Sequence, residues 1–273
     1  TSYTVESSTI TLYNPTKTGY TFTGWTGSNG TTPQTKVTIS KGSTGNKSYT
    51  ANWTINQYTL TVNPNGGIYN NTTNNSTYTQ NYNTTKDLGT PTAPVGYKIT
   101  FNGNGGTNPK EVTTTKTFTS WNNILGGGSI SGTTYTFGAG NGTVKAIYKN
   151  NAVNILPTTT RNGYTFAGWY TDVTEGTEIK APYEASENIT LYAHWTANKY
   201  TVTFNGNGGS NGTSIKKTYN TVLGTLPTST RQGYRFKGWY TASTGGSKIA
   251  ETTKMPPSDI TYYAQWERIN YTI

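Results

Sequence analysis

Few side chains in this sequence could carry out chemistry. His194 is the only histidine and cysteine is absent, which excludes a thiol nucleophile and a cysteine-ligated metal. Asp172, Glu175 and Glu178 form the densest acidic group. A retaining glycosidase needs two carboxylates ~5 Å apart in a cleft, and nothing in the sequence places a partner for this group. We interpret it as a solvated loop, and we predict no catalytic residue, no cofactor and no metal site.

The single histidine lies in a run of alternating residues, Leu-Tyr-Ala-His-Trp. The equivalent positions of two similar segments hold Asn52 and Gln265. By alternation the His194 side chain points away from the core, so we interpret it as a variable surface position rather than a catalytic base.

Three glycine-rich runs invite comparison with phosphate-binding loops. They are Gly103–Gly106, Gly126–Gly128 and Gly138–Gly142. No Gly-Lys-Ser/Thr follows them and no apolar helix begins after them, so the phosphate-loop motif fails. We predict turns at all three.

The elements that hold these residues are repeats. Four segments carry an aromatic strand that ends in Trp: 19–25, 116–121, 163–169 and 233–239. Each is followed 26 to 28 residues later by a second strand that ends in an aromatic residue: Trp53, Tyr148, Trp195 and Trp266. Apolar residues alternate with polar ones in these second strands, which is typical of half-buried strands. We predict that the Trp residues anchor small cores: Trp25, Trp53, Trp169, Trp195, Trp239 and Trp266.

A further motif begins a repeat. It is an alternating strand that runs into an Asn/Gly turn, at 58–67, 97–106 and 200–209. Asn and Gly supply the positive φ that a tight turn needs.

The repeats divide the chain into five parts. Residues 1–54 are a partial repeat that has the second half only, 55–150 a degenerate repeat, 151–197 a truncated or interrupted repeat, 198–267 a complete repeat, and 268–273 the first strand of a following repeat. Residues 55–197 are either one degenerate unit followed by a truncated one, or one unit interrupted by another. Both ends fall inside repeats, so we expect a longer parent chain, with head-to-tail strand donation between copies as the alternative.

Composition and charge narrow the function. The chain is 31% hydrophobic and 12% charged, with 22 Tyr and 7 Trp, which suits small aromatic cores better than one large core. Residues 1–150 hold 10 Lys against 3 acidic residues, a net +7, whereas residues 151–273 carry a net +3. Because the charges are scattered singly, we expect no nucleic-acid partner, and no segment is apolar enough to insert into a membrane.

These motifs resemble the Listeria–Bacteroides repeat, the B-repeat of internalin-type surface proteins. The resemblance lies in residues 202–209, 226–240 and 260–266, and again in 155–195. It implies tandem small β-grasp (ubiquitin-like) domains in an elongated array, mostly β and α+β at most, on secreted or wall-attached bacterial proteins. Repeats of this family act as stalks and spacers, some contribute to host-cell engagement, and they share no catalytic residues.

We therefore expect a non-enzymatic extracellular segment: a stalk, spacer, filament or surface-layer element of an adhesin-like protein whose partners are neighbouring repeats. The alternative is a module that binds carbohydrate, meaning a host glycan, or an anionic cell-wall polymer. Four tyrosines point outward by alternation and are the candidate platform: Tyr170, Tyr192, Tyr240 and Tyr263.

Overall fold

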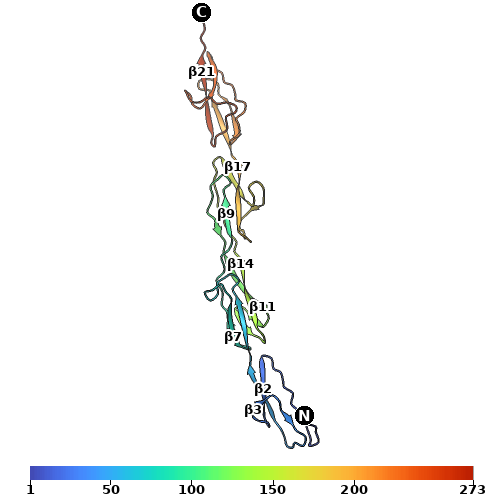
Figure 1. Cartoon of the computed structure of the whole chain (residues 1–273). Coiled ribbons are helices and arrows are strands. Elements are labelled where there is room, and N and C mark those ends of the chain that lie inside the picture. Colours follow the sequence, from blue (N-terminus) through green and yellow to red (C-terminus); the bar gives the residue numbers. More distant parts are fainter. Residues whose placement is uncertain (273) are drawn as a thin grey trace. The chain divides into compact units, whose positions relative to one another are not determined.

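The computed structural model describes residues 1–272, and these residues form strands, turns and loops without a helix (Figure 1). It follows that no helix in this part of the chain could span a membrane. The all-β architecture agrees with a sequence rich in Thr and Tyr, which favour strands, and in Gly and Asn, which favour turns.

The chain divides into two compact units, each built from two separate segments of the sequence. One unit contains residues 1–96 and 115–151, and the other contains residues 97–114 and the chain from Ala152 onward. Sheet pairing divides each unit into two modules. We name them by their residues: the N-terminal module (1–55), the second (57–96 with 115–150), the third (97–114 with 152–197) and the fourth (198–268).

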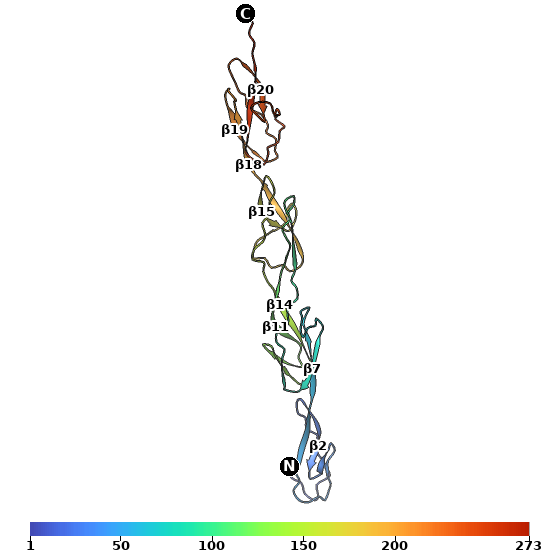
Figure 2. The ribbon, with the colours of Figure 1, turned by 90° about the vertical axis from the view of Figure 1, so that its left-hand side faces the viewer.

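The fourth module has the simplest sheet (Figure 2). Its strands, in the spatial order β19-β18-β21-β20, are β18 (Lys199–Asn205), β19 (Gly212–Thr218), β20 (Tyr234–Tyr240) and β21 (Ile260–Arg268). The outer pairs are antiparallel, whereas the central pair β18 and β21 is parallel. Alternate residues of β18, Val202 and Phe204, point to one face and are fully buried with Trp239 and Leu223. This is the half-buried alternation that the sequence predicts.

The third module repeats this arrangement with strands that are far apart in sequence. They are β9 (Lys98–Asn102), β10 (Val112–Thr113), β15 (Tyr164–Tyr170), β16 (Glu178–Ile179) and β17 (Ile189–Ala197), in the order β10-β9-β17-β15-β16. Strand β9 pairs in parallel with β17. Its alternate residues Ile99 and Phe101 form the core with Trp169 and Leu191.

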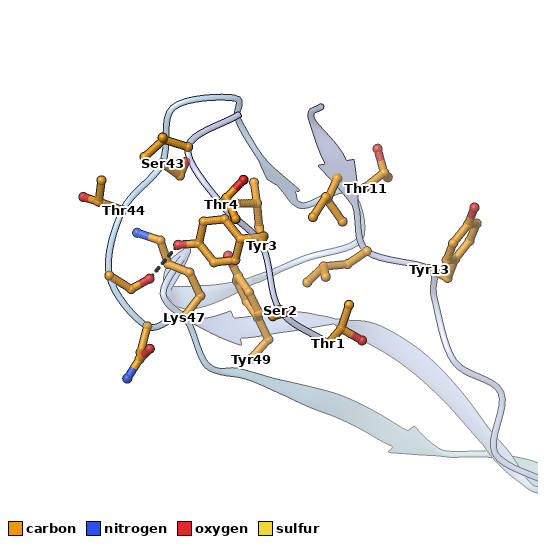
Figure 3. A pocket seen from close by; sticks show the side chains of 16 residues that line it. Thr1, Ser2, Tyr3, Thr4, Thr11, Tyr13, Ser43, Thr44, Lys47 and Tyr49 are labelled. Atoms are coloured by element: carbon orange, nitrogen blue, oxygen red, sulfur yellow. Dashed lines mark hydrogen bonds between the residues drawn. The ribbon is translucent and has the colours of Figure 1, made fainter. Parts of the chain in front are cut away.

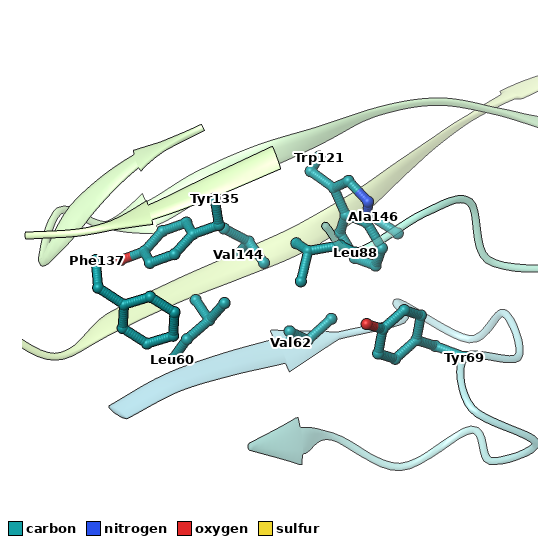
Figure 4. Packing of buried hydrophobic residues seen from close by; sticks show 9 residues of the cluster. All are labelled: Leu60, Val62, Tyr69, Leu88, Trp121, Tyr135, Phe137, Val144 and Ala146. Atoms are coloured by element: carbon teal, nitrogen blue, oxygen red, sulfur yellow. The ribbon is translucent and has the colours of Figure 1, made fainter. Parts of the chain in front are cut away.

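The second module has the same four-stranded sheet and an added three-stranded sheet. Its strands are β6 (Gln57–Asn63), β7 (Ser76–Asn81), β8 (Thr85–Asp87), β11 (Lys116–Leu125), β12 (Gly128–Ser131), β13 (Thr134–Phe137) and β14 (Gly142–Asn150). The sheets have the orders β11-β14-β6-β7 and β12-β13-β8. Figure 4 shows Leu60 and Val62 of β6 in one cluster with Val144 of the neighbouring strand β14 and with Tyr135 and Phe137 of β13.

The N-terminal module lacks a strand equivalent to β6, β9 or β18. It consists of β1 (Ile10–Thr11), β2 (Tyr20–Gly27), β3 (Gly30–Gln34), β4 (Thr38–Ile39) and β5 (Tyr49–Ile55), in sheets of order β3-β2-β5 and β1-β4. Strand β5 therefore pairs on one side only, with β2. Val37 is the single hydrophobic residue that is buried in the described module.

Strand pairing groups residues 55–197 in a way that the sequence left open. The strand that begins at Lys98 pairs with β17 of the third module, while β6 pairs with β14 of the second. Each of these modules is thus interrupted by part of the other, since residues 97–114 pair within the third module although they lie between the two segments of the second. The parallel pairs join residues about 80 to 90 positions apart, and no local sequence pattern carries that information.

Candidate functional site

The Trp that ends each aromatic strand lies at a fixed place in the complete modules. Trp239 is 1% exposed and Trp169 is 2% exposed. The indole Nε1 of each donates to a proline carbonyl 2.6 Å away, that of Pro227 or Pro157. Because both the ring and its N–H are satisfied, these residues are fully integrated into their cores.

A second Trp, near the end of the last strand, binds the turn that follows the first strand. The Nε1 groups of Trp266 and Trp195 donate to the carbonyls of Gly206 and Gly103, each over 3.0 Å. In the second module the hydroxyl of Tyr148 donates to Pro64 O over 2.8 Å in the same position. These bonds fix the first strand at its C-terminal end.

An asparagine of the turn reaches back across the last strand. Asn207 adopts φ of 47°, in the left-handed region that Asn tolerates, and its Nδ2 donates to Ala264 O over 2.9 Å. Asn104 and Asn65 make the same bond to Ala193 O and Ala146 O at 3.0 and 2.9 Å. The Asn-Gly-Gly motif is therefore a clamp as well as a turn.

The two remaining Trp anchors lie in the N-terminal module and are only half-buried. Trp25 Nε1 is shielded from solvent but has no hydrogen-bond partner. Trp53 Nε1 finds no acceptor among residues 1–272. The Phe22 ring packs 5.4 Å from both indoles, so the aromatic group forms without the bonds that satisfy it elsewhere.

The four candidate tyrosines form two cross-strand pairs, Tyr170 with Tyr192 and Tyr240 with Tyr263. All four are half-buried. Tyr170 also stacks on His194, with ring centroids 3.8 Å apart and an angle of 10° between the planes.

His194 fastens a loop. Its Nε2 lies 2.9 Å from Asp172 O, and Gln265 at the equivalent position donates to Ala242 O over 3.1 Å. Asp172 Oδ1 accepts from Thr174 N over 3.1 Å, and that bond lowers the pKa of the carboxyl group. These groups hold the turn at residues 171–177, and no cluster of potential metal ligands occurs in the described chain.

Burial shifts the pKa of three tyrosine hydroxyls. Desolvation raises the pKa of the hydroxyls of Tyr135, Tyr148 and Tyr262, so these phenols stay neutral near pH 7.

The most elaborate polar network joins successive modules, at Asn198 in one unit. Asn198 N donates to Gly163 O over 3.0 Å and its carbonyl accepts from Tyr219 N over 2.7 Å. Its side chain accepts from Thr165 Oγ1 over 2.6 Å and donates to Tyr200 Oη over 3.2 Å. One residue thus makes four bonds to the third and fourth modules.

Asn56 builds the same network in the other unit. It bonds Gly19 O and Tyr82 N through its backbone, at 2.9 and 2.8 Å, and Thr21 Oγ1 and Tyr58 Oη through its side chain, at 2.5 and 3.3 Å.

A tyrosine ring covers a glycine at each of these joints. A Cβ on Gly163 would lie 2.4 Å from the Tyr219 ring, and one on Gly19 would lie 2.1 Å from the Tyr82 ring. The covering ring also packs edge-on against a second tyrosine: Tyr164 with Tyr219 at 5.4 Å, and Tyr20 with Tyr82 at 6.1 Å. We call these two networks the Asn joints.

Sequence reasoning found the spacing of the Asn joints but not their contacts. The junctions after Trp53 and Trp195 share Trp-Thr-x-Asn-x-Tyr. The Asn at a fixed position was the available signal, but its partners Gly19 and Tyr82 lie outside the junction.

Comparison with known proteins agrees with this repeat architecture. The Listeria-Bacteroides repeat domain matches residues 97–139, 127–194 and 200–265, and the divergent InlB B-repeat domain matches residues 1–57.

Three relatives match parts of the chain. Internalin H of Listeria monocytogenes serovar 1/2a is 45% identical over 112 residues, covering 40% of this chain and 20% of the relative. A putative Gly-rich membrane protein of Evansella cellulosilytica is 33% identical over 132 residues, covering 48% and 15%, and a putative membrane protein of the same organism is 34% identical over 115 residues, covering 41% and 17%. The matched segments span a fifth or less of these relatives. With the family model matching well over half of its residues, this chain belongs to the Listeria-Bacteroides repeat family.

Proposed function

We propose that this chain is a spacer segment of a bacterial surface protein in which the Asn joints hold neighbouring modules at a fixed angle. The relatives support a repeat-bearing surface or secreted protein, since one is an internalin and two are named as membrane proteins. The main support for this proposal is that Asn56 and Asn198 make the same four hydrogen bonds in two separate units.

The Asn joints account for stiffness in physical terms. A free four-residue connection would allow wide motion between modules. Here Asn198 bonds Gly163 and Thr165 on one side and Tyr219 on the other. The Tyr219 ring fills the space above Gly163. Any bend at this point must break hydrogen bonds and expose an aromatic contact.

The sheet order supports a finer assignment of the modules. A central parallel pair formed by the first and last strands, flanked by antiparallel neighbours, is the strand order of a β-grasp domain. We propose that the complete modules are β-grasp-like, with a loop where that fold carries a helix. Leu223, from the loop between β19 and β20, and Met255, from the loop between β20 and β21, are buried in the core of this module.

A binding module remains the second candidate. Its support is the net +7 of residues 1–150, which favours weak attraction to an anionic polymer. A sugar platform has less support, because Tyr170, Tyr192, Tyr240 and Tyr263 are half-buried and Tyr170 is stacked on His194.

Distance measurement across the Asn198 joint tests the spacer. The chain has no cysteine, so spin labels on Glu175→Cys and Thr252→Cys report one distance between the third and fourth modules. We expect a single narrow distribution that broadens when Asn198→Gly and Tyr219→Ala are introduced together. Thr213→Ala, on an exposed strand residue, is the matched control and should leave the distribution unchanged. A broad distribution in the unaltered joint would refute the proposal.

A further inference from the structure

A small polar pocket lies in the third module, where the turn after β9 meets the start of β15 and the second half of β17. Its volume is about 240 Å³. A guanidinium, a phenol, an imidazole and an indole line it, those of Arg161, Tyr164, His194 and Trp195, together with Asn104 and Thr174 of two turns. The lining contains no carboxylate. The pocket therefore combines a cation with aromatic rings.

Arg161 is held in place without being neutralised. Its guanidinium carbon lies 4.1 Å from the centre of the Tyr164 ring, and its Nη1 donates to Asn104 O over 3.3 Å. Gly105 lets the group approach the turn, since a Cβ there would lie 3.2 Å from the guanidinium carbon. No carboxylate pairs with Arg161 in the described chain. Arginine has five N–H donors, so several of them remain for a ligand.

The fourth module contains the same arrangement. The guanidinium carbon of Arg231 lies 4.0 Å from the centre of the Tyr234 ring, and its Nη1 donates to Asn207 O over 3.5 Å. Trp266 Nε1 reaches the same carbonyl over 3.2 Å, which places the indole beside the guanidinium. Within residues 1–272 this arginine also has no carboxylate partner. We call the two groups the arginine sites: Arg161 with Tyr164 and Trp195, and Arg231 with Tyr234 and Trp266.

The loops beside the two arginine sites differ in charge. In the third module this loop carries Asp172 and Glu175, whereas the matching positions of the fourth module hold Ala242 and Gly245. The Asp172 carboxylate turns back to its own loop, where it accepts from Thr174 N over 3.1 Å. Its charge and that of Glu175 still oppose a nearby anion. An anionic ligand should therefore bind more tightly in the fourth module than in the third.

The N-terminal module contains a larger cavity, of about 930 Å³, with different chemistry (Figure 3). Hydroxyl and aliphatic side chains line most of it, and the Tyr3 hydroxyl donates to Gly45 O over 2.5 Å. Lys47 is the one charged side chain in the lining, and no indole or guanidinium takes part. This larger cavity therefore does not offer the recognition chemistry of the arginine sites.

We propose that each arginine site binds one carboxylated sugar ring of an anionic polysaccharide. The guanidinium donates two parallel N–H bonds to the carboxylate, the pairing that its planar fork favours. The apolar face of the sugar packs on the half-buried indole, and ring hydroxyls bond polar side chains at the rim, which are Thr174 and His194 in the third module. A bare inorganic anion would use the guanidinium but leave the indole uncovered, so the indole favours a sugar acid.

A tetramer of galacturonic acid provides a defined probe. The chain has 7 Trp, and their indole N–H resonances report on the sites. We expect those of Trp195 and Trp266 to shift saturably as the tetramer is added, while those of the buried Trp169 and Trp239 stay in place. Trp266 should saturate at the lower concentration, because its loop lacks acidic residues. The methyl ester of the tetramer keeps the sugar but loses the charge, and should bind at least about tenfold more weakly.

Arg161→Gln and Arg231→Gln remove the two cations one at a time. Each should abolish the response of the indole in its own site and leave the other response intact. Arg235→Gln removes the same charge from an exposed residue of β20 and is the matched control, which should leave both responses unchanged. The buried Trp169 and Trp239 indoles report whether a variant is folded. If a Gln variant unfolds, Arg161→Lys and Arg231→Lys carry the test, since they keep the charge but lose the fork and should bind more weakly.

The proposal fails if the two indoles do not shift, if the methyl ester binds as tightly as the free acid, or if folded Arg variants respond like the unaltered chain. The last result would leave the arginines with a structural role at their turns. A glycerol phosphate oligomer distinguishes the anion. Weaker binding than that of the sugar acid supports the proposal, whereas equal binding means that the sites recognise negative charge alone and overturns it. This inference does not depend on the spacer proposal, because the distance across the Asn198 joint is measured without a ligand.

Discussion

The fourth and N-terminal modules contain the same aromatic strands but differ in how well these strands bury their Trp residues. Trp239 is 1% exposed and its N–H is bonded, whereas the matching Trp25 is half-buried with an unsatisfied N–H. The strands around the two residues pair alike. The difference is β18, which brings Val202 and Phe204 into one core and has no counterpart in the other. The two aromatic strands alone form an antiparallel pair. The first strand is needed to close a hydrophobic core over that pair.

The largest effect should follow loss of the central Trp. Trp239→Ala removes a fully buried indole and should cost the fourth module about 3–5 kcal/mol, enough to unfold it while the other modules stay folded. Trp25→Ala should cost clearly less, since that ring is half-buried and its N–H is unsatisfied. Module-resolved hydrogen exchange measures both, and equal losses at the two positions would break the comparison.

A pair of glycines isolates the packing at the Asn joints. Gly163 and Gly233 have similar φ, 81° and 74°, so Ala strains both by about 1 kcal/mol. Only Gly163→Ala meets a ring, that of Tyr219, while Gly233 has no atom within 4 Å of an added Cβ. We expect Gly163→Ala to cost about 1–3 kcal/mol more. Thermal unfolding of the two variants provides the measurement, and similar melting temperatures would contradict the packing.

The turn asparagine should matter less than the core. Asn207→Ala removes the bonds to Ser243 O and Ala264 O, at 2.8 and 2.9 Å, and should cost about 1–3 kcal/mol. Asn211, which accepts from Gly206 N over 2.7 Å, allows comparison with a bond inside the turn. Urea unfolding of Asn207→Ala and Asn211→Ala would show whether the clamp across the last strand is the stronger contact.

The smallest expected effect is the loss of one hydrogen bond to Asp172 at acid pH. The Thr174 N–H bond lowers the pKa of Asp172, so its stabilisation is present above the ordinary carboxyl pKa and is lost as pH falls through the lowered value. We expect the Thr174 amide resonance to shift in that acid range, and not in Asp172→Asn. The matching loop of the fourth module has Ala242 and should show no such transition.

The sequence predicted the strands better than their partners. Alternation identified the strands at 200–204 and 260–266, because side-chain direction is local. The pairing of β9 with β17 was out of reach, since the interrupted segments carry two copies of each motif and only tertiary register selects between them. His194, which the sequence predicts to point away from the core, stacks on Tyr170, its diagonal neighbour on β15, because a flat ring on a strand surface can cover a residue two positions from its direct partner.

Hydrogen exchange at the two matching last strands tests the central claim most directly. The amides of Lys47 and Tyr49 point away from β2, because Ser48 N bonds Ser28 Oγ on the β2 side and backbone groups alternate in direction along a strand. Since Phe22 pairs with Trp53 as Phe236 pairs with Trp266, the matching residues are Ile260 and Tyr262, which lie in the strand segment that pairs with β18. We expect the amides of Lys47 and Tyr49 to exchange far faster than those of Ile260 and Tyr262, whereas residues 50–55 and 263–268, which pair with β2 and β20, should be protected in both modules. Equal protection of the two sets of amides would contradict the view that the first strand closes each core.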